Sequence, residues 1–270
     1  MSAADRRSRA TPVRREPPKF RRVEVRRVER VTPRLVRVTF GGPELEGLTV
    51  EQPAASVRLL LPSPGTRELV MPEWNGNEFL LAGGRRPTIR TFTPWRVDAD
   101  DRELDLGIVV HGTGAASGWA ETARPGDTGA ISGPGRGYSI DDDAPAFLLA
   151  GDETAIPAIT QLLERLPADT PVRVHVEAGH PDARLALPDH QHAAIEWHDL
   201  PSGVAPGEML VAAVSDAEIA PGTKIWAAGE AAAVWRVRRH LFEDLGLPRA
   251  QAAVRGYWKR GRTADTDDDD

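Results

Sequence analysis

The stretch Phe147-Leu-Leu-Ala-Gly-Asp-Glu-Thr-Ala-Ile-Pro157 decides the fold of the second half of this 270-residue chain. It opens with the unbroken apolar run Phe147–Ala150, which is typical of a strand buried on both faces of a parallel sheet. A glycine and three polar residues follow, and Pro157 is compatible with the first turn of a helix. Apolar residues then recur at helical spacing as far as Leu166. The stretch therefore predicts a strand–turn–helix unit.

The same order of strand, turn and helix continues after Leu166 and predicts a parallel sheet with helices packed on it over residues 145–262. The turn at Gly229-Glu230 repeats the order of strand, glycine, acid and helix. Because the carboxyl ends of parallel strands meet at one sheet edge, where nucleotides bind, the two turns predict a cleft. Asp152 and Thr154 can also be simple helix caps. The further predicted strands are Val172–Val176, Ala193–Trp197, Lys224–Ala228 and Ala252–Val254, and the predicted helices are Glu208–Val214 and about 231–245.

The first half of the chain has a different pattern. Apolar and polar residues alternate in short runs, which Gly- and Pro-rich turns separate, and the pattern predicts one short helix at Ser117–Ala123. We therefore expect an antiparallel β-barrel over residues 19–142. Its predicted strands include Val23–Val25, Val36–Phe40, Val57–Leu61, Leu104–Val110 and Gly129–Ser132.

Charge is concentrated at the two ends of the chain, whose formal net charge is −6. Residues 1–37 hold 13 Lys and Arg against four acids, and residues 263–270 hold five Asp and no base. Residues 1–18 and 263–270 are predicted to be disordered, with charges that aid solubility. A basic arm can also bind nucleic acid or an acidic membrane surface. We expect neither, because the arm lacks an amphipathic helical pattern.

Composition excludes several kinds of site. The chain has no Cys, which rules out disulfides, thiol catalysis, zinc–thiolate sites and Cys-ligated iron–sulfur clusters. The longest apolar runs, such as Met209–Val214, are too short to span a bilayer, and the N-terminus lacks the pattern of a signal peptide. We therefore expect a cytoplasmic protein. Asp189, His190 and His192 are interpreted as part of a surface loop, and no metal site is predicted.

A glycine-rich turn, His111-Gly-Thr-Gly-Ala-Ala-Ser-Gly118, follows the strand predicted at Leu104–Val110. A Rossmann unit is excluded, because it needs about 30 residues of strand–helix–strand and the helix here is too short. Exposed amides at a helix N-terminus nevertheless suit a pyrophosphate. A tight barrel turn is the alternative interpretation, and the segment alone does not decide between them.

Two further segments carry side chains suited to ligands. In Arg90-Thr-Phe-Thr-Pro94 an arginine can pair with phosphate, an aromatic ring can pack on a flat ring, and a hydroxyl can donate to a ring nitrogen. An ordinary amphipathic strand is the alternative. In Arg255-Gly-Tyr-Trp-Lys-Arg-Gly-Arg262 two aromatic residues precede three cations, which suits an anionic or aromatic ligand. The alternative there is packing of the aromatic side chains against the domain.

Six segments in this order resemble the siderophore-interacting proteins, which are FAD-dependent ferric-siderophore reductases of the ferredoxin-reductase-like superfamily. The resemblance covers roughly Phe20 to Gly261. The segments are Arg90–Thr93, Leu106-Gly-Ile-Val-Val-His111-Gly with Ala116-Ser-Gly-Trp-Ala120, Pro125-Gly-Asp127, Leu149–Ile159, Trp226-Ala-Ala-Gly-Glu230 and Gly256-Tyr-Trp-Lys-Arg-Gly261.

The resemblance implies an FAD site in the barrel. Arg90, Thr91, Phe92 and Thr93 match the family's Arg-x-Tyr-Thr motif, with Arg90 on phosphate and Thr93 near the flavin N5. Phe92 replaces the usual Tyr, so a phenol hydrogen bond to the flavin is lost while ring packing remains available. Ala115 stands where the family usually has Pro, which leaves the amides of the turn available. The residues implied to cradle the FAD pyrophosphate are His111, Gly114, Ala115, Ala116, Ser117 and Trp119.

The resemblance also implies sites for the electron donor and the substrate. Asp152, Glu153 and Thr154 match the turn that faces both FAD and the nicotinamide cleft, and Gly229 and Glu230 match the turn on the nicotinamide side. Lys259, with Arg260 nearby, matches the basic position that meets the ferric siderophore.

The resemblance implies that the protein transfers electrons from NADPH or NADH through FAD to chelated Fe(III) and releases Fe(II) in the cytosol. We expect the protein to be a monomer. The identity of the electron donor stays open. Glu177 would favour NADH by bonding to ribose hydroxyls, and Arg184 would favour NADPH by pairing with a 2′-phosphate. Reduced ferredoxin is a third candidate. Two alternative functions also stay open. One is a flavin reductase with a different acceptor, and the other is a non-catalytic ferric-siderophore-binding protein.

Overall fold

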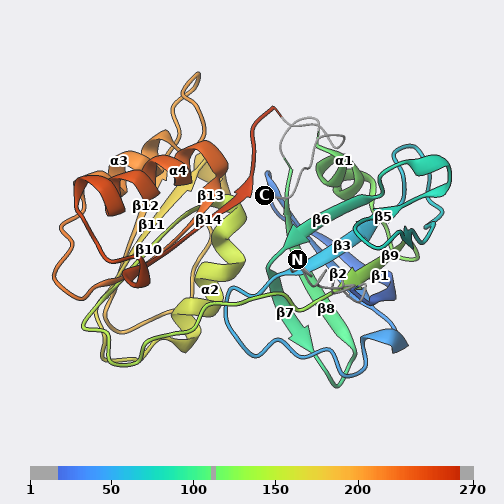
Figure 1. Ribbon diagram of the computed structural model, residues 1–270, viewed down its shortest axis with the longest axis horizontal. Coiled ribbons are helices and arrows are strands. Elements are labelled where there is room, and N and C mark those ends of the chain that lie inside the picture. Colours follow the sequence, from blue (N-terminus) through green and yellow to red (C-terminus); the bar gives the residue numbers. More distant parts are fainter. Residues whose placement is uncertain (1–17, 111–113, 262–270) are drawn as a thin grey trace, which may run out of the picture.

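The computed structural model describes residues 18–110 and 114–261, whose two larger sheets lie side by side (Figure 1). The first half of the chain builds a seven-stranded antiparallel sheet, and the second half builds a five-stranded parallel sheet. The predicted fold class, an antiparallel barrel followed by a parallel-sheet domain, is confirmed. The predicted basic arm and acidic tail lie outside the described residues, apart from Pro18.

The seven-stranded sheet closes on itself. Its strand order is β6-β3-β9-β1-β2-β8-β7, so β6 and β7 are the two edges, and Thr93 is the sole residue between them in the chain. The sheet must therefore curl until its edges approach each other, as a barrel requires. The strands are β1 (Phe20–Thr32), β2 (Leu35–Gly41), β3 (Val57–Leu61), β6 (Thr88–Phe92), β7 (Pro94–Asp98), β8 (Glu103–Val109) and β9 (Thr128–Ser132).

Alternate residues of these strands fill the barrel. Val25, Val38, Phe40, Leu59 and Leu106 are completely buried, as the alternation in the sequence predicts. A small ribbon of β4 (Glu73–Trp74) and β5 (Phe79–Leu80) was not predicted, because strands of two residues are too short to show periodicity. The α-helix described in this half, α1 (Ala115–Thr122), begins two residues before the predicted helix.

The parallel sheet has the strand order β12-β11-β10-β13-β14. Helix α2 packs on one face and lies between the sheet and the barrel, while α3 and α4 cover the other face (Figure 1). The strands are β10 (Phe147–Asp152), β11 (Val172–Ala178), β12 (Ala193–Asp199), β13 (Lys224–Glu230) and β14 (Ala252–Trp258), and the helices are α2 (Ile156–Arg165), α3 (Glu208–Asp216) and α4 (Ala231–Arg239).

The last helix ends as the sequence predicts, although its geometry changes on the way. Regular α-helix stops at Arg239, a π-turn continues through His240–Asp244, and Gly246 follows with φ +64°. A glycine in this left-handed conformation is a common helix stop. None of the described helices is long and apolar enough to cross a membrane. The 3-10 segments are Pro43–Leu45, Ala82–Gly84, Glu153–Ala155, Pro181–Ala183 and Arg249–Gln251.

Candidate functional site

The barrel and the α/β domain meet where the barrel closes. Thr93 is buried, and its Oγ1 lies 3.2 Å from the phenol oxygen of Tyr257, near the end of β14. Burial raises the pKa of the Tyr257 phenol, so Tyr257 keeps its proton at neutral pH and one hydroxyl donates to the other. Sequence reasoning predicted a ligand role for Thr93 and missed this contact.

A β-bulge near the end of β14 accompanies this contact. Gly229 pairs with Gly256 and Glu230 pairs with Trp258, which leaves Tyr257 as an extra residue opposite β13. Bulges re-aim side chains in this way. Tyr257 also packs edge-on against the buried Trp226, with ring centroids 6.2 Å apart. The aromatic pair after Gly256 therefore packs against the protein, which was the alternative interpretation of this segment.

Asp152 connects the carboxyl ends of three parallel strands. Its Oδ2 accepts hydrogen bonds from the Glu230 amide at 3.0 Å and from Nε1 of Trp258 at 2.7 Å. Its Oδ1 accepts from the amide of Thr154 at 2.9 Å and from its hydroxyl at 2.5 Å. Burial raises the pKa of Asp152, and the hydrogen bonds act in the opposite direction. Both carboxylate oxygens are engaged, so Asp152 fixes the ends of β10, β13 and β14 relative to one another.

Gly229 and Glu230 lie on the same sheet edge. A Cβ atom at Gly229 would stand 2.7 Å from Oδ2 of Asp152, so this close approach requires glycine. Oε2 of Glu230 accepts from the amides of Ala232 and Ala233 at 2.6 and 3.0 Å and caps α4. Its Oε1 accepts from the Arg260 amide at 3.1 Å. The hydrogen bond from the Glu230 amide to Asp152 thus brings the two strand–glycine–acid turns together at one sheet edge.

Glu153 is paired with a residue that sequence reasoning missed. Both of its carboxylate oxygens accept from Nε of Arg34, in the turn between β1 and β2, at 3.0 and 2.9 Å. The Gly179 amide donates to Oε1 at 3.1 Å. Burial raises the pKa of Glu153, while the Arg34 guanidinium lowers it. Arg34 joins the barrel to the turn after β10, and no local sequence pattern around Thr32-Pro-Arg34 signals this partner.

The N-terminus of α1 is the candidate phosphate site. Gly114 is the N-cap residue, and no described side chain caps the first turn of the helix. Gly114, Ala115 and Ala116 are half-buried and Ser117 is buried, so no bulky side chain of this turn blocks a close approach. These features fit a pyrophosphate. His111 lies outside the described residues.

The Arg90–Thr93 motif lies on the edge strand β6 and in the turn after it. Arg90 is half-buried, and its Nη1 donates to the carbonyl of Ile89 at 2.6 Å, which holds the guanidinium close to the strand. Thr91 is exposed, and Phe92 packs against the barrel core. Trp119 packs inward too, stacked on Phe40 with ring centroids 5.9 Å apart, and so supports α1 from beneath.

Lys259 and Arg260 follow β14 directly, and both are exposed. Within the described part of the chain, no carboxylate lies at ion-pair distance from either side chain. The backbone of Arg260 is held by Glu230. The two cations therefore stand at the carboxyl end of β14, in an arrangement suited to an anionic ligand.

Gln161 of α2 fixes the helix to the barrel beside Thr93. Its Nε2 donates to the carbonyl of Pro94 at 2.6 Å, and its Oε1 accepts from the amide of Ala54 at 2.9 Å. The side chain is buried, so each of these hydrogen bonds satisfies a polar group that water does not reach.

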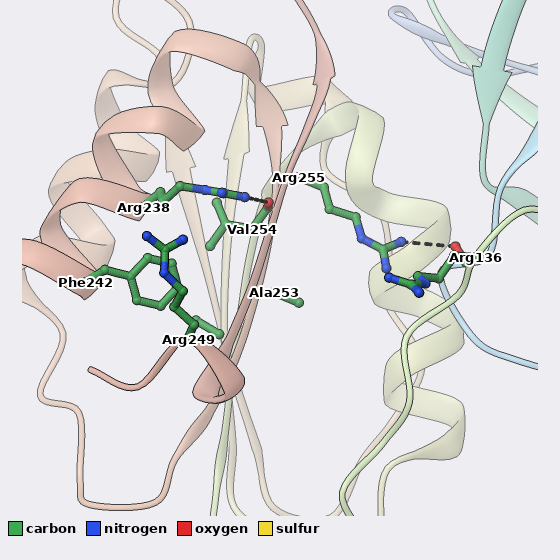
Figure 2. A pocket seen from close by; sticks show the side chains of 8 residues that line it. Arg136, Arg238, Phe242, Arg249, Ala253, Val254 and Arg255 are labelled. Atoms are coloured by element: carbon green, nitrogen blue, oxygen red, sulfur yellow. Dashed lines mark hydrogen bonds between the residues drawn. The ribbon is translucent and has the colours of Figure 1, made fainter. Parts of the chain in front are cut away.

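Arg255 fixes the other side of the interface. Arg255 lies on β14, and its guanidinium donates to the carbonyls of Arg136 and Gly137 at 3.2 and 2.7 Å (Figure 2). The hollow around it, about 520 Å³ in volume, contains none of the residues predicted to bind FAD or substrate. Arg255 therefore holds the two domains together.

The two residues weighed for donor specificity are both engaged elsewhere. Glu177 accepts from the amides of Gly207, Met209 and Leu210 at 2.6 to 3.1 Å and caps α3. Arg184 makes a two-point pair with Asp199, at 3.2 and 2.6 Å. In the described structure both side chains have partners within the protein, and the choice between NADH and NADPH stays open.

Comparison with known proteins identifies the chain's relatives. The family described as "Siderophore-interacting FAD-binding domain" matches residues 24–138, and the family described as "Siderophore-interacting protein" matches residues 144–261. The crystal structure of a siderophore utilization protein from T. fusca is 37% identical, with a TM-score of 0.81 over 93% of this chain and 97% of that chain.

Two further relatives bear on activity and fold. The ferric vibriobactin reductase of Vibrio cholerae is 28% identical over 86% of both chains. The FAD/NAD-binding domain of a Vibrio cholerae nitric oxide dioxygenase is 16% identical, with a TM-score of 0.61 over 88% of this chain and 98% of that chain, and so shares the fold alone. The architecture is that of the ferredoxin-reductase-like flavoproteins, and the chain belongs to the siderophore-interacting protein family.

Proposed function

We propose that this protein is an FAD-dependent reductase of ferric siderophores that uses NADPH or NADH and releases Fe(II) in the cytosol. The observation that carries the proposal is the run Tyr257–Arg260. This run begins at a contact with Thr93, at the closure of the barrel, and ends with the exposed cations Lys259 and Arg260, two and three residues later. A site for FAD and a surface for an anionic iron complex would thus be joined by one short segment.

The residues around the proposed flavin site supply binding and orientation. The amides at the start of α1 and the guanidinium of Arg90 would hold the phosphates. Thr93, fixed by Tyr257, would present a hydroxyl to the ring. Bound FAD supplies the chemistry, because it accepts two electrons from a nicotinamide and gives them up singly. One NAD(P)H and two Fe(III) would yield NAD(P)⁺, one proton and two Fe(II).

The iron complex would be held by charge. Many siderophores present hard oxygen ligands and carry negative charge when bound to Fe(III), and Lys259 and Arg260 offer cations without a described carboxylate partner. Fe(II) binds hard oxygen ligands more weakly than Fe(III) does, so reduction would release the iron.

The test has two steps. The purified protein is incubated with excess FAD and desalted, and its absorption spectrum is expected to show retained flavin. It is then mixed anaerobically with NADPH or NADH and a ferric siderophore, and Fe(II) is followed with a colour-forming chelator. Fe(II) in excess of the flavin present is expected. Retained flavin that reduces a quinone and not the iron complex would favour a different acceptor, and binding of the complex without flavin would favour a carrier.

A further inference from the structure

A cluster of two histidines and a glutamate lies outside the site described above. His175 of β11 pairs in register with Glu196 of β12, and His198 is two residues further along β12. Side chains alternate along a strand, so all three point to the same face of the sheet. This is the α3 face, because Val174 and Val176 pack with α2 on the opposite side. The cluster therefore faces away from the barrel and from Thr93.

The polar atoms of the three side chains converge. Nδ1 of His175 lies 3.0 Å from Nε2 of His198 and 3.8 Å from Oε2 of Glu196, and all three donor atoms lie within 4.8 Å of one another. The His175 side chain is 6% exposed, and its Nε2 has no described hydrogen-bond partner. The described polar contacts of this buried ring are thus both at Nδ1, which faces Nε2 of His198 and Oε2 of Glu196. A single proton on Nδ1 can point to one of these two atoms and not to both.

We infer that His175, Glu196 and His198 form a binding site for a divalent transition-metal ion of the Zn²⁺ type. Zn²⁺ binds His nitrogen and carboxylate oxygen at about 2.0–2.2 Å in a tetrahedral arrangement, so neighbouring donor atoms stand about 3.3 Å apart. The observed separations of 3.0 and 3.8 Å bracket that value. An ion between the three atoms would satisfy both contacts of Nδ1.

The surroundings suit such an ion. β12 is the edge strand, and the Glu196 side chain is 55% exposed, which gives an ion a route from solvent and leaves a fourth position for water. Mixed imidazole and carboxylate donors favour Zn²⁺, Ni²⁺, Co²⁺ or Cu²⁺ over a hard cation such as Mg²⁺. The sequence analysis predicted no metal site, because the pairing of β11 with β12 is not visible in one sequence.

The experiment is a titration of metal-free, FAD-loaded full-length protein with Zn²⁺ in competition with a chromogenic chelator. One tight site per chain is expected, and His198→Ala and Glu196→Gln should each weaken it at least tenfold. Both side chains lie on the edge strand, so the variants are expected to fold, which retained flavin and circular dichroism would verify. His180→Ala is the matched control, because His180 stands 3.6 Å from Asp182 with no second histidine in the described contacts.

Zinc-edge X-ray absorption of the one-to-one complex is expected to show two imidazole ligands at about 2.0 Å. The inference would be overturned if the wild type bound no Zn²⁺ at micromolar concentration. It would also be overturned if His198→Ala bound Zn²⁺ as tightly as the wild type, or if His180→Ala lost the site. The result does not depend on the proposed reductase activity, since the cluster is on the sheet face opposite the flavin side.

Discussion

Asp152 accepts four hydrogen bonds in the described structure, two on each oxygen, although its carboxylate is buried. Asp152→Asn would turn an amide NH₂ toward donors that now point at oxygen, whichever way it is oriented. We expect the free energy of unfolding to fall by about 1–3 kcal/mol, the typical cost of unsatisfied buried polar groups. Urea denaturation measures it. Asp182→Asn, at an exposed site, is the control and should change stability by less than about 0.5 kcal/mol.

The chain has two tyrosines, and burial raises the pKa of both Tyr138 and Tyr257. In the folded protein both phenols should stay protonated above pH 10, whereas in the unfolded chain they ionise near the ordinary value of about 10. Stability from these groups is thus present below pH 10 and is lost as pH rises toward the folded pKa. The absorbance of ionised tyrosine at 295 nm should rise at a higher pH in the native protein than in the protein unfolded in guanidinium. Coincident titration curves would contradict the raised pKa of the two phenols.

Lys259 is the residue on which substrate binding is expected to depend most. Lys259→Ala should raise the KM for an anionic ferric siderophore about tenfold, because a charge-assisted contact contributes about 1.5–3 kcal/mol. Flavin content should stay unchanged. Lys19→Ala removes the same charge from an exposed position just before β1 and should leave the KM as it is. Equal KM values for both variants would remove Lys259 from the substrate site.

At the scale of single elements, Glu177 connects the end of β11 to the start of α3. It accepts from three amides at the helix start, so Glu177→Ala should lower the free energy of unfolding by about 2 kcal/mol, the upper range for loss of a cap. The ratio of NADH to NADPH activity should not move, because no oxygen of Glu177 is left for a ribose. A shift in that ratio would restore the role in donor choice that the sequence first suggested.

Most elements were predictable from periodicity, and most partners were not. The apolar run Phe147–Ala150 and the alternation around Phe40 lie at the strands they predict, since burial on one or two faces leaves a direct pattern. The bulge at Tyr257 and the pairing of β11 with β12 depend on register between distant segments, which one sequence does not encode visibly. For that reason the contacts of Thr93, Glu177 and His175 were missed.

At the scale of the whole molecule, the two domains are joined by side chains on both sides of the barrel closure. Arg34 reaches Glu153 from the barrel, Gln161 reaches Pro94 from α2, and Arg255 reaches the segment at Arg136. Three separate contacts of this kind resist rotation of one domain against the other. The periodicity of the sequence predicted the two domains and their order, and it did not predict these interdomain side chains.

The proposed function requires electrons to pass from the flavin of this protein to chelated Fe(III). The most direct measurement uses FAD-loaded protein reduced anaerobically with one equivalent of dithionite and then mixed with an excess of ferric siderophore. This step needs no nicotinamide, so it does not depend on which donor is used. The account predicts recovery of the oxidised flavin spectrum with two Fe(II) formed per FAD. A flavin that stays reduced in the presence of the iron complex would contradict it.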